Sequence, residues 1–139
     1  MLSNDDCIFC KIIVEEIPSK ILYQNNDTIA FLDIFPISQG HTVVIPKKHY
    51  TNLETIPINE LCEVMETVKI VSNMIYKNLN IEGYNILQNN HKAAGQVVNH
   101  FHIHIIPRSS ADGKFKLLIP RKQATEEELN QTLKIIRDS

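Results

Sequence analysis

Three histidines alternate with apolar residues late in the chain, in the run His100-Phe101-His102-Ile103-His104-Ile105-Ile106. Strict alternation of polar and apolar residues is typical of a half-buried β-strand. Because successive strand side chains point to opposite faces, the histidines are expected on one face and their apolar neighbours in the core. Neighbouring histidines of such a row lie about 6.6 Å apart. Imidazole rings are costly to bury without partners, so we interpret this row as a site for chemistry.

Two kinds of chemistry are open to the row. A His-x-His pair on a strand can supply two zinc ligands and leave a position for a reactive water. Alternatively, a neutral imidazole can attack phosphorus, while flanking imidazoles and amides stabilise the charge on the phosphate oxygens. Residue types alone do not decide between a hydrolytic zinc ion and a nucleophilic histidine.

A second candidate is the pair in Cys7-Ile8-Phe9-Cys10. Two thiolates at this spacing can bind one zinc ion, but the same motif also fits a redox pair or two buried thiols. The third cysteine, Cys62, is expected to be a core thiol. An odd number of cysteines does not suit a disulfide framework, so we expect a reducing, cytoplasmic setting.

Short strands and one long helix must position these residues. Strands are expected over 21–24, 28–34, 41–45, 83–89 and 100–106, and helices over 11–17, 58–78 and from Thr125, which opens a capping box, to about residue 137. In the long helix, helical spacing predicts a core face of Leu61, Met65, Val68, Val71 and Ile75. This order favours an α+β fold, an antiparallel sheet covered by a helix.

The overall composition narrows the function classes. A chain of 139 residues with 43% hydrophobic and 22% charged residues suits one globular domain. The net charge is −2 and no basic stripe is present, so nucleic acid is not an expected partner. No apolar run is long enough to cross a membrane, and the acidic start is unlike a signal peptide.

Short matches over nearly the whole chain resemble the histidine triad (HIT) superfamily. They comprise the alternating histidine run with Pro107, Ile8-Phe9, Phe31-Leu32-Asp33-Ile34, His41, Val44-Ile45-Pro46-Lys47-Lys48-His49, Asn89 and Gly95-Gln96. The arrangement is most similar to the Hint-like branch, especially its bacterial members. The resemblance implies a single HIT domain over residues 1–139. It also implies a five-stranded antiparallel sheet with one long helix packed on it, a short N-terminal helix and a C-terminal helix.

The resemblance also implies roles for individual residues. His102 matches the nucleophile that attacks the α-phosphorus, and His104 and His41 match histidines on the phosphate and leaving-group side. Gln96 and Asn89 match amides that hydrogen-bond phosphate oxygens, so His102, His104, His41 and Gln96 form the expected catalytic set. Asp33, which by itself could equally be a solvated acid at a strand end, matches the acceptor of both ribose hydroxyls. The apolar walls around the purine match Ile8, Phe9, Phe31 and Ile34. Val97 departs from the pattern, because animal Hint proteins carry a serine there near the leaving group.

In bacterial members of the branch, a structural zinc is held by residues that match Cys7, Cys10, His49 and His100. Such a closed site has no open position for a reactive water. The resemblance therefore implies structural Zn²⁺ and no organic cofactor.

The expected function is hydrolysis or nucleotidyl transfer on purine nucleoside 5′-phosphate derivatives, of the adenosine phosphoramidate or acyl-adenylate type. The alternatives are a dinucleoside polyphosphate hydrolase of the Fhit type and a non-catalytic nucleotide-binding module. Hint-type proteins are homodimers that pair through the long helix and a neighbouring strand, so a homodimer is expected here.

Overall fold

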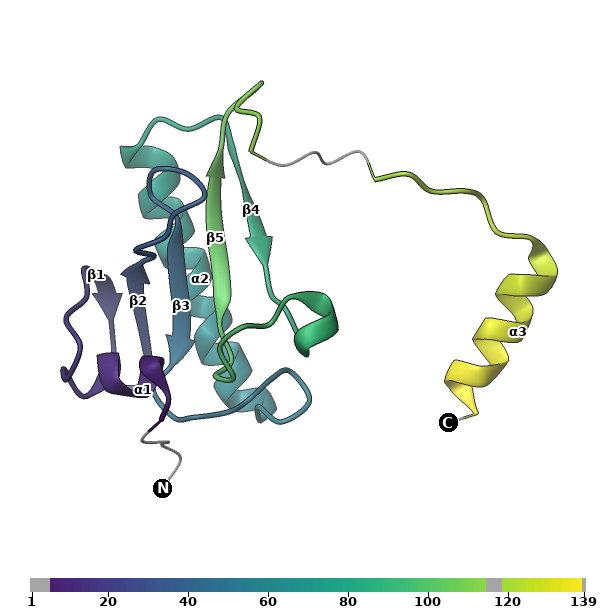
Figure 1. The fold of residues 1–139 in the computed structure, drawn as a ribbon, viewed down its shortest axis with the longest axis horizontal. Coiled ribbons are helices and arrows are strands. Elements are labelled where there is room, and N and C mark those ends of the chain that lie inside the picture. The colour runs from purple at the N-terminus through teal and green to yellow at the C-terminus, as the bar shows by residue number, and fades with distance from the viewer. Residues whose placement is uncertain (1–5, 115–118, 139) are drawn as a thin grey trace.

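A five-stranded antiparallel sheet forms the centre of the molecule. The computed structural model describes residues 6–114 and 119–138. The strands lie in the order β1 (Ile21–Gln24), β2 (Thr28–Leu32), β3 (Thr42–Pro46), β5 (Ile103–Arg108) and β4 (Gly83–Leu87). The helices are α1 (Ile8–Ile13), α2 (Ile58–Asn78) and α3 (Glu126–Arg137), and Lys92–Ala94 forms a 3₁₀ turn, η1. The predicted α+β architecture is confirmed (Figure 1).

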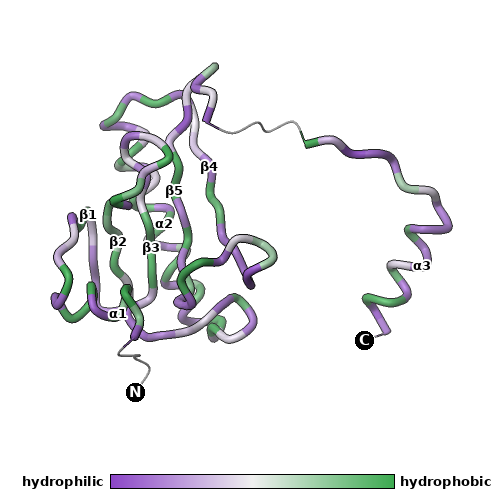
Figure 2. The backbone as a smooth tube through the Cα atoms, in the orientation of Figure 1, coloured by the Kyte–Doolittle hydropathy of each residue, from purple (hydrophilic) through white to green (hydrophobic). Residues whose placement is uncertain are grey.

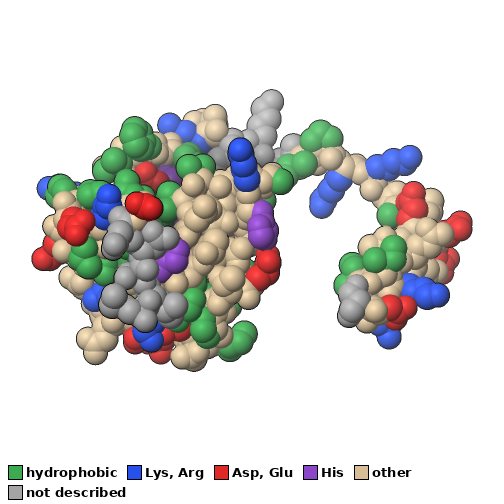
Figure 3. All heavy atoms as spheres, turned by 60° about the horizontal axis from the view of Figure 1, so that its bottom comes forward, with side chains coloured by type: hydrophobic (Ala, Val, Ile, Leu, Met, Phe, Trp, Pro, Cys, Tyr) green, Lys and Arg blue, Asp and Glu red, His purple; other side chains and the backbone are tan. Residues whose placement is uncertain are grey.

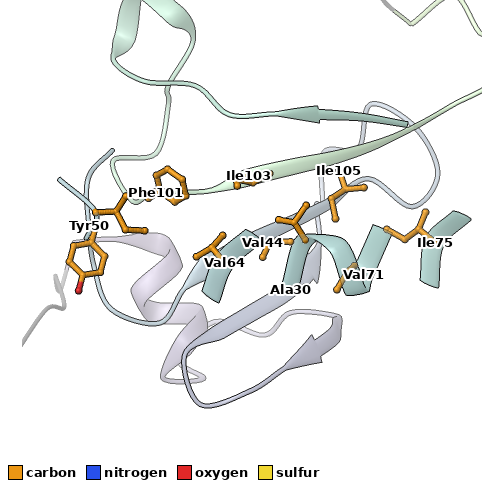
Figure 4. Packing of buried hydrophobic residues seen from close by; sticks show 11 residues of the cluster. Ala30, Val44, Tyr50, Val64, Val71, Ile75, Phe101, Ile103 and Ile105 are labelled. Atoms are coloured by element: carbon orange, nitrogen blue, oxygen red, sulfur yellow. The ribbon is translucent and has the colours of Figure 1, made fainter. Parts of the chain in front are cut away.

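Both faces of the sheet are covered by hydrophobic packing. On one face, the alternating apolar residues of the histidine run pack with β2 and β3 against α2 (Figure 4). Hydrophobic stretches run along β2, β3 and β5 (Figure 2). On the other face, α1 packs its buried side chains against β2 and β3, with Phe9 and Ile12 meeting Ile29, Phe31 and Ile45. The histidines lie on this same face, because His104 pairs with Val43 of the cluster under α1.

The long helix has the predicted bounds, and most of its predicted core face is confirmed: Val68, Val71 and Ile75 are buried, and Leu61 packs against the same core. Val64 is fully buried, whereas Met65 is 43% exposed and Cys62 is exposed, so the predicted core thiol is wrong. The buried face includes the small polar residue Thr67, whose Oγ1 lies 2.6 Å from Thr28 Oγ1 on β2. Because a hydrogen-bonded threonine can pack closely against a strand, the apolar residues alone did not define this face.

The histidine strand begins later than predicted. Its pairing with β3 starts at Ile103, opposite Val44, so His100 and His102 precede β5. Pro46 ends β3 and has no N–H to continue the ladder. Instead, the Pro46 carbonyl accepts a hydrogen bond from His100 Nε2 at 2.9 Å. The His100 side chain thus takes the place of a backbone hydrogen bond between β3 and the segment before β5.

The remaining helices differ in how well they were predicted. α1 begins at Ile8 rather than at residue 11, because the Cys7 thiol caps it by accepting the Cys10 N–H at 3.3 Å. Glu15, with a φ of 64°, follows its end. The predicted capping box at Thr125 is confirmed. α3 lies apart from the sheet, and its side chains are exposed (Figures 1 and 3).

Candidate active site and metal centre

The backbone determines which nitrogen of His102 can react. His102 Nδ1 lies 2.7 Å from the His100 carbonyl oxygen, which can only accept, so Nδ1 carries the proton. In the neutral ring, Nε2 then presents a lone pair. His102 is 6% exposed, and burial lowers its pKa, so the neutral form is favoured.

His41 and His104 form a hydrogen-bonded pair with a defined direction. The Ile37 N–H donates to His41 Nδ1 at 3.0 Å, so the proton of neutral His41 lies on Nε2. His41 Nε2 is 2.9 Å from His104 Nδ1, and it donates there. Neutral His104 therefore carries its own proton on Nε2. Burial lowers the pKa of His104 to about 4, and the neighbouring His102 and His41 act in the same direction.

Asp33 lies at the end of this pair, just after β2. One of its oxygens is 3.5 Å from His41 Nε2, and the other accepts the Phe35 N–H at 2.8 Å. Burial lowers the pKa of His41, and the charge of Asp33 opposes this effect. Asp33, His41 and His104 are close enough to share a metal ion. However, His41 Nε2 already carries a proton, so this arrangement is better suited to proton transfer than to metal binding.

A cavity of about 460 Å³ opens beside these groups. His102, His104 and Asp33 line one part of it. The predicted purine walls all line it as well: Ile8, Phe9, Phe31 and Ile34. The cavity therefore combines an apolar slot with an acid and two imidazoles, as expected for a site that binds a base, a sugar and a phosphate.

Gln96 and Asn89 are not among the residues that line the cavity. The Gln96 amide donates to the carbonyls of Thr51, at 2.7 Å, and Val98, at 3.2 Å, and its oxygen accepts the His91 N–H. Both amide hydrogens are thus used within the loops. Gln96 holds these loops together in this structure, and its contact with phosphate stays a prediction, as does that of Asn89.

The four predicted metal ligands converge from three distant segments. Cys7 Sγ and Cys10 Sγ lie 3.4 and 3.6 Å from His100 Nδ1, and Cys10 Sγ lies 3.4 Å from His49 Nδ1. Tetrahedral zinc, with bonds of about 2.3 Å to sulfur and about 2.05 Å to nitrogen, would separate such ligands by roughly 3.6 Å. His100 Nε2–H donates to Pro46, which leaves Nδ1 unprotonated for a metal. The donor set and its spacing therefore fit zinc.

Two parts of the site were missed from the sequence. Phe35 lines the cavity, although it is 82% exposed. Val97, which the resemblance had placed near the leaving group, also lines it. An aromatic residue next to the predicted wall residue Ile34 was an available signal for Phe35. The Ile37 N–H and the His100 carbonyl, which set the proton positions, are backbone groups, so no residue type could have indicated them.

Known proteins share both the sequence pattern and the fold of this chain. The model of the HIT domain family matches residues 14–111. An uncharacterized HIT-like protein of Methanocaldococcus jannaschii is 45% identical over 131 residues, which are 94% of this chain and 98% of the relative. An adenosine 5′-monophosphoramidase of Candida albicans is 45% identical over 112 residues, which are 78% of this chain and 74% of the relative.

Solved structures share the fold. A HIT family protein of Bacillus anthracis has a TM-score of 0.89 at 36% identity, with 98% of both chains covered. A zinc-bound histidine triad family protein of Mycobacterium smegmatis has a TM-score of 0.74 at 31% identity, with 94% of this chain and 91% of that chain covered. None of the described helices is long and apolar enough to cross a membrane.

Proposed function

Because this chain belongs to the HIT domain family, we propose that it hydrolyses purine nucleoside 5′-phosphate derivatives, or transfers their nucleotidyl group, through a nucleotidyl-histidine intermediate. The chain is a nucleotide hydrolase of the phosphoramidase type. Adenosine phosphoramidates and acyl-adenylates are its substrate class. A relative named as an adenosine 5′-monophosphoramidase supports this assignment.

The observation that carries the proposal is the hydrogen bond from His102 Nδ1 to the His100 carbonyl. It leaves the Nε2 lone pair as the nucleophile in a ring that burial keeps neutral. Nε2 attacks the α-phosphorus, a bond from nitrogen to phosphorus forms, and the bond from phosphorus to the leaving group breaks. Water then attacks the same phosphorus, which releases the nucleoside monophosphate and frees His102.

His104 assists as the opposite tautomer, with its proton on Nε2 instead of Nδ1. Its Nε2–H donates to the phosphate or the leaving group, and the His41 Nε2–H, which donates to His104 Nδ1, orients the ring. Asp33 accepts the ribose hydroxyls, while Phe9, Phe31 and their apolar neighbours hold the purine.

The test is mass spectrometry of reactions with an adenosine phosphoramidate, quenched within the first turnovers. We expect an adenylyl adduct on His102 and loss of adduct and turnover in His102→Ala. His91→Ala is the matched control, because His91 is an exposed histidine paired with Glu54 outside the cavity. Faster turnover of a dinucleoside polyphosphate would favour the Fhit type. Neither adduct nor turnover on either substrate would leave a binding module.

The metal centre is structural zinc in this proposal, and no organic cofactor takes part. Its four ligands are all protein side chains, and a zinc-bound relative of the same family supports the assignment. When bound, the ion would link Cys7 and Cys10 to His49 and His100, so it would hold α1 against the loop after β3. Thiolate ligands require reduced cysteines, which suits a cytoplasmic protein.

A homodimer completes the proposal. β4 is an outer strand of the sheet, and Tyr84 and Ile86 on it are 40% and 44% exposed. Tyr84 lies next to Tyr76 of α2, with ring centroids 6.1 Å apart. An apolar edge strand beside an exposed helix side is a surface that a second copy can cover. The single domain binds small nucleotides, and neither nucleic acid nor a membrane is a partner.

A further inference from the structure

The segment that carries the two cysteines also builds the base-binding wall of the cavity. Cys7 and Cys10 point to the metal centre, while Ile8 and Phe9 between them line the cavity. α1 has only six residues, and a helix of that length is not stable by itself in water. Its position therefore depends on what its side chains bind and contact.

The Phe9 ring contacts both a residue of the metal centre and the proposed nucleophile. Its ring lies edge-on to His102, with centroids 5.1 Å apart, and edge-on to Phe31 at 5.6 Å. It also meets the metal-ligand residue His100 at 5.9 Å. A shift of α1 would move Phe9 away from the purine and from the nucleophile together.

His100 provides a second connection. Its Nδ1 faces both thiols, its Nε2–H is held by Pro46, and its carbonyl fixes the proton on His102. A metal ion on Nδ1 would thus hold the residue that defines the reactive nitrogen of His102.

We propose that zinc and the nucleotide bind with positive linkage, and that Phe9 is the positioning residue that transmits it. This inference rests on the proposed nucleotide function. Bound zinc holds α1 so that Phe9 is already in place for the purine, and the bound purine in turn holds α1 in the position that brings both thiols to the metal. Linkage is reciprocal, so each ligand changes the affinity of the other by the same factor, typically about 5- to 150-fold.

The experiment uses the full chain and two ligands, Zn²⁺ and AMP. Zinc affinity is measured by competition with a chromophoric chelator, with and without saturating AMP. We expect AMP to lower the zinc Kd by about 10-fold, and zinc removal to raise the AMP Kd by the same factor. Ribose 5-phosphate, which lacks the base, should leave the zinc Kd unchanged.

Variants distinguish linkage through α1 from a general effect of folding. In Phe9→Ala the change in zinc Kd caused by saturating AMP should fall towards one-fold, whatever the zinc Kd of that variant without AMP. Lys11→Ala, on the same helix, should keep the full linkage. An unchanged zinc Kd in the wild type, or equal linkage in Phe9→Ala, would overturn the inference. Failure of AMP to bind the zinc-loaded protein would instead overturn the proposed function.

Discussion

The chemistry of each histidine depends on which ring nitrogen carries the proton. Two backbone groups decide this: the His100 carbonyl fixes the proton on His102, and the Ile37 N–H fixes it on His41. The His41 ring in turn determines the proton position on His104. The result is one histidine with a lone pair and one with an N–H beside the same cavity. A nitrogen lone pair and a hydrogen-bond donor therefore arise from the same residue type.

The Asp33→Asn variant tests ribose binding. Hydrogen bonds to a charged group contribute about 1.5–3 kcal/mol, so we expect AMP to bind about 10- to 100-fold more weakly by calorimetry. Binding of 2′,3′-dideoxy-AMP should hardly change, since it lacks both hydroxyls. A variant that still prefers AMP over the dideoxy nucleotide as strongly as the wild type would refute this role.

The lowered pKa of His104 predicts how stability depends on pH. With a pKa of about 4 in the folded state against 6.5 for the ordinary group, His104 binds fewer protons folded than unfolded in this window. The free energy of unfolding should therefore fall as the pH drops from 6.5 towards 4. We expect His104 to account for about 1–2 kcal/mol of the loss between pH 7 and pH 5.

Urea unfolding at both pH values measures this loss. In His104→Asn, which has no titrating ring, the decrease should be smaller by that amount. Equal decreases in the two proteins would show that His104 is not held neutral by the fold.

At the scale of elements, one face of the sheet forms the main core and the other face carries the candidate site. α2 and the apolar side of β5 form the main core, while α1 and the loops around the histidines form the cavity and the metal centre. The histidines are held in place because the apolar residues that alternate with them, Phe101, Ile103 and Ile105, are packed in the core on the opposite face. A slip of one residue would exchange the two faces.

Which side of α2 is buried against the sheet can be tested with Val64→Ala. Val64 is fully buried against the sheet, so truncation should lower the free energy of unfolding by about 2–3 kcal/mol. Glu66→Ala, at an exposed position of the same helix, should change it by less than about 0.5 kcal/mol. Equal effects in urea unfolding would contradict the observed burial.

At the scale of the whole molecule, two exposed apolar surfaces lie away from the cavity in the described part of the chain. One is the β4 edge with Tyr84 and Ile86, and the other is the side of α3 that carries Leu129, Leu133 and Ile136. These three α3 residues follow helical spacing, so they form one stripe. Both surfaces suit a protein that functions as more than one chain.

Ile86→Lys tests the dimer at its edge strand. A lysine on an exposed edge opposes strand pairing, so the mass in analytical ultracentrifugation should fall from about twice the 15.9 kDa chain to a single chain. Ile21→Lys, at a similarly exposed position on the opposite edge strand β1, should leave the dimer intact. A wild-type monomer, or a dimeric Ile86→Lys variant, would exclude this interface.

Local sequence patterns were enough to predict several elements of this protein and its candidate site residues. Strict alternation was enough to separate the histidines from the core residues beside them, and apolar spacing was enough to bound α2, because both signals repeat over short distances. The capping box at Thr125 is likewise contained within four residues. The resemblance of the histidine run to the HIT family, and the metal ligands it implied, also followed from residue types in order.

Only the tertiary structure decided what depends on distant contacts. Cys7 and His100 are 93 positions apart, and only the packing of α1 on the sheet brings them together. The proton positions on His102 and His41 depend on backbone groups, which every residue carries and no sequence pattern marks. The use of Gln96 as a loop brace and the burial of Thr67 are decided by partners 45 and 39 residues away. The sequence therefore identifies which side chains can take part in chemistry. The fold determines where these side chains point and which of their atoms carry protons.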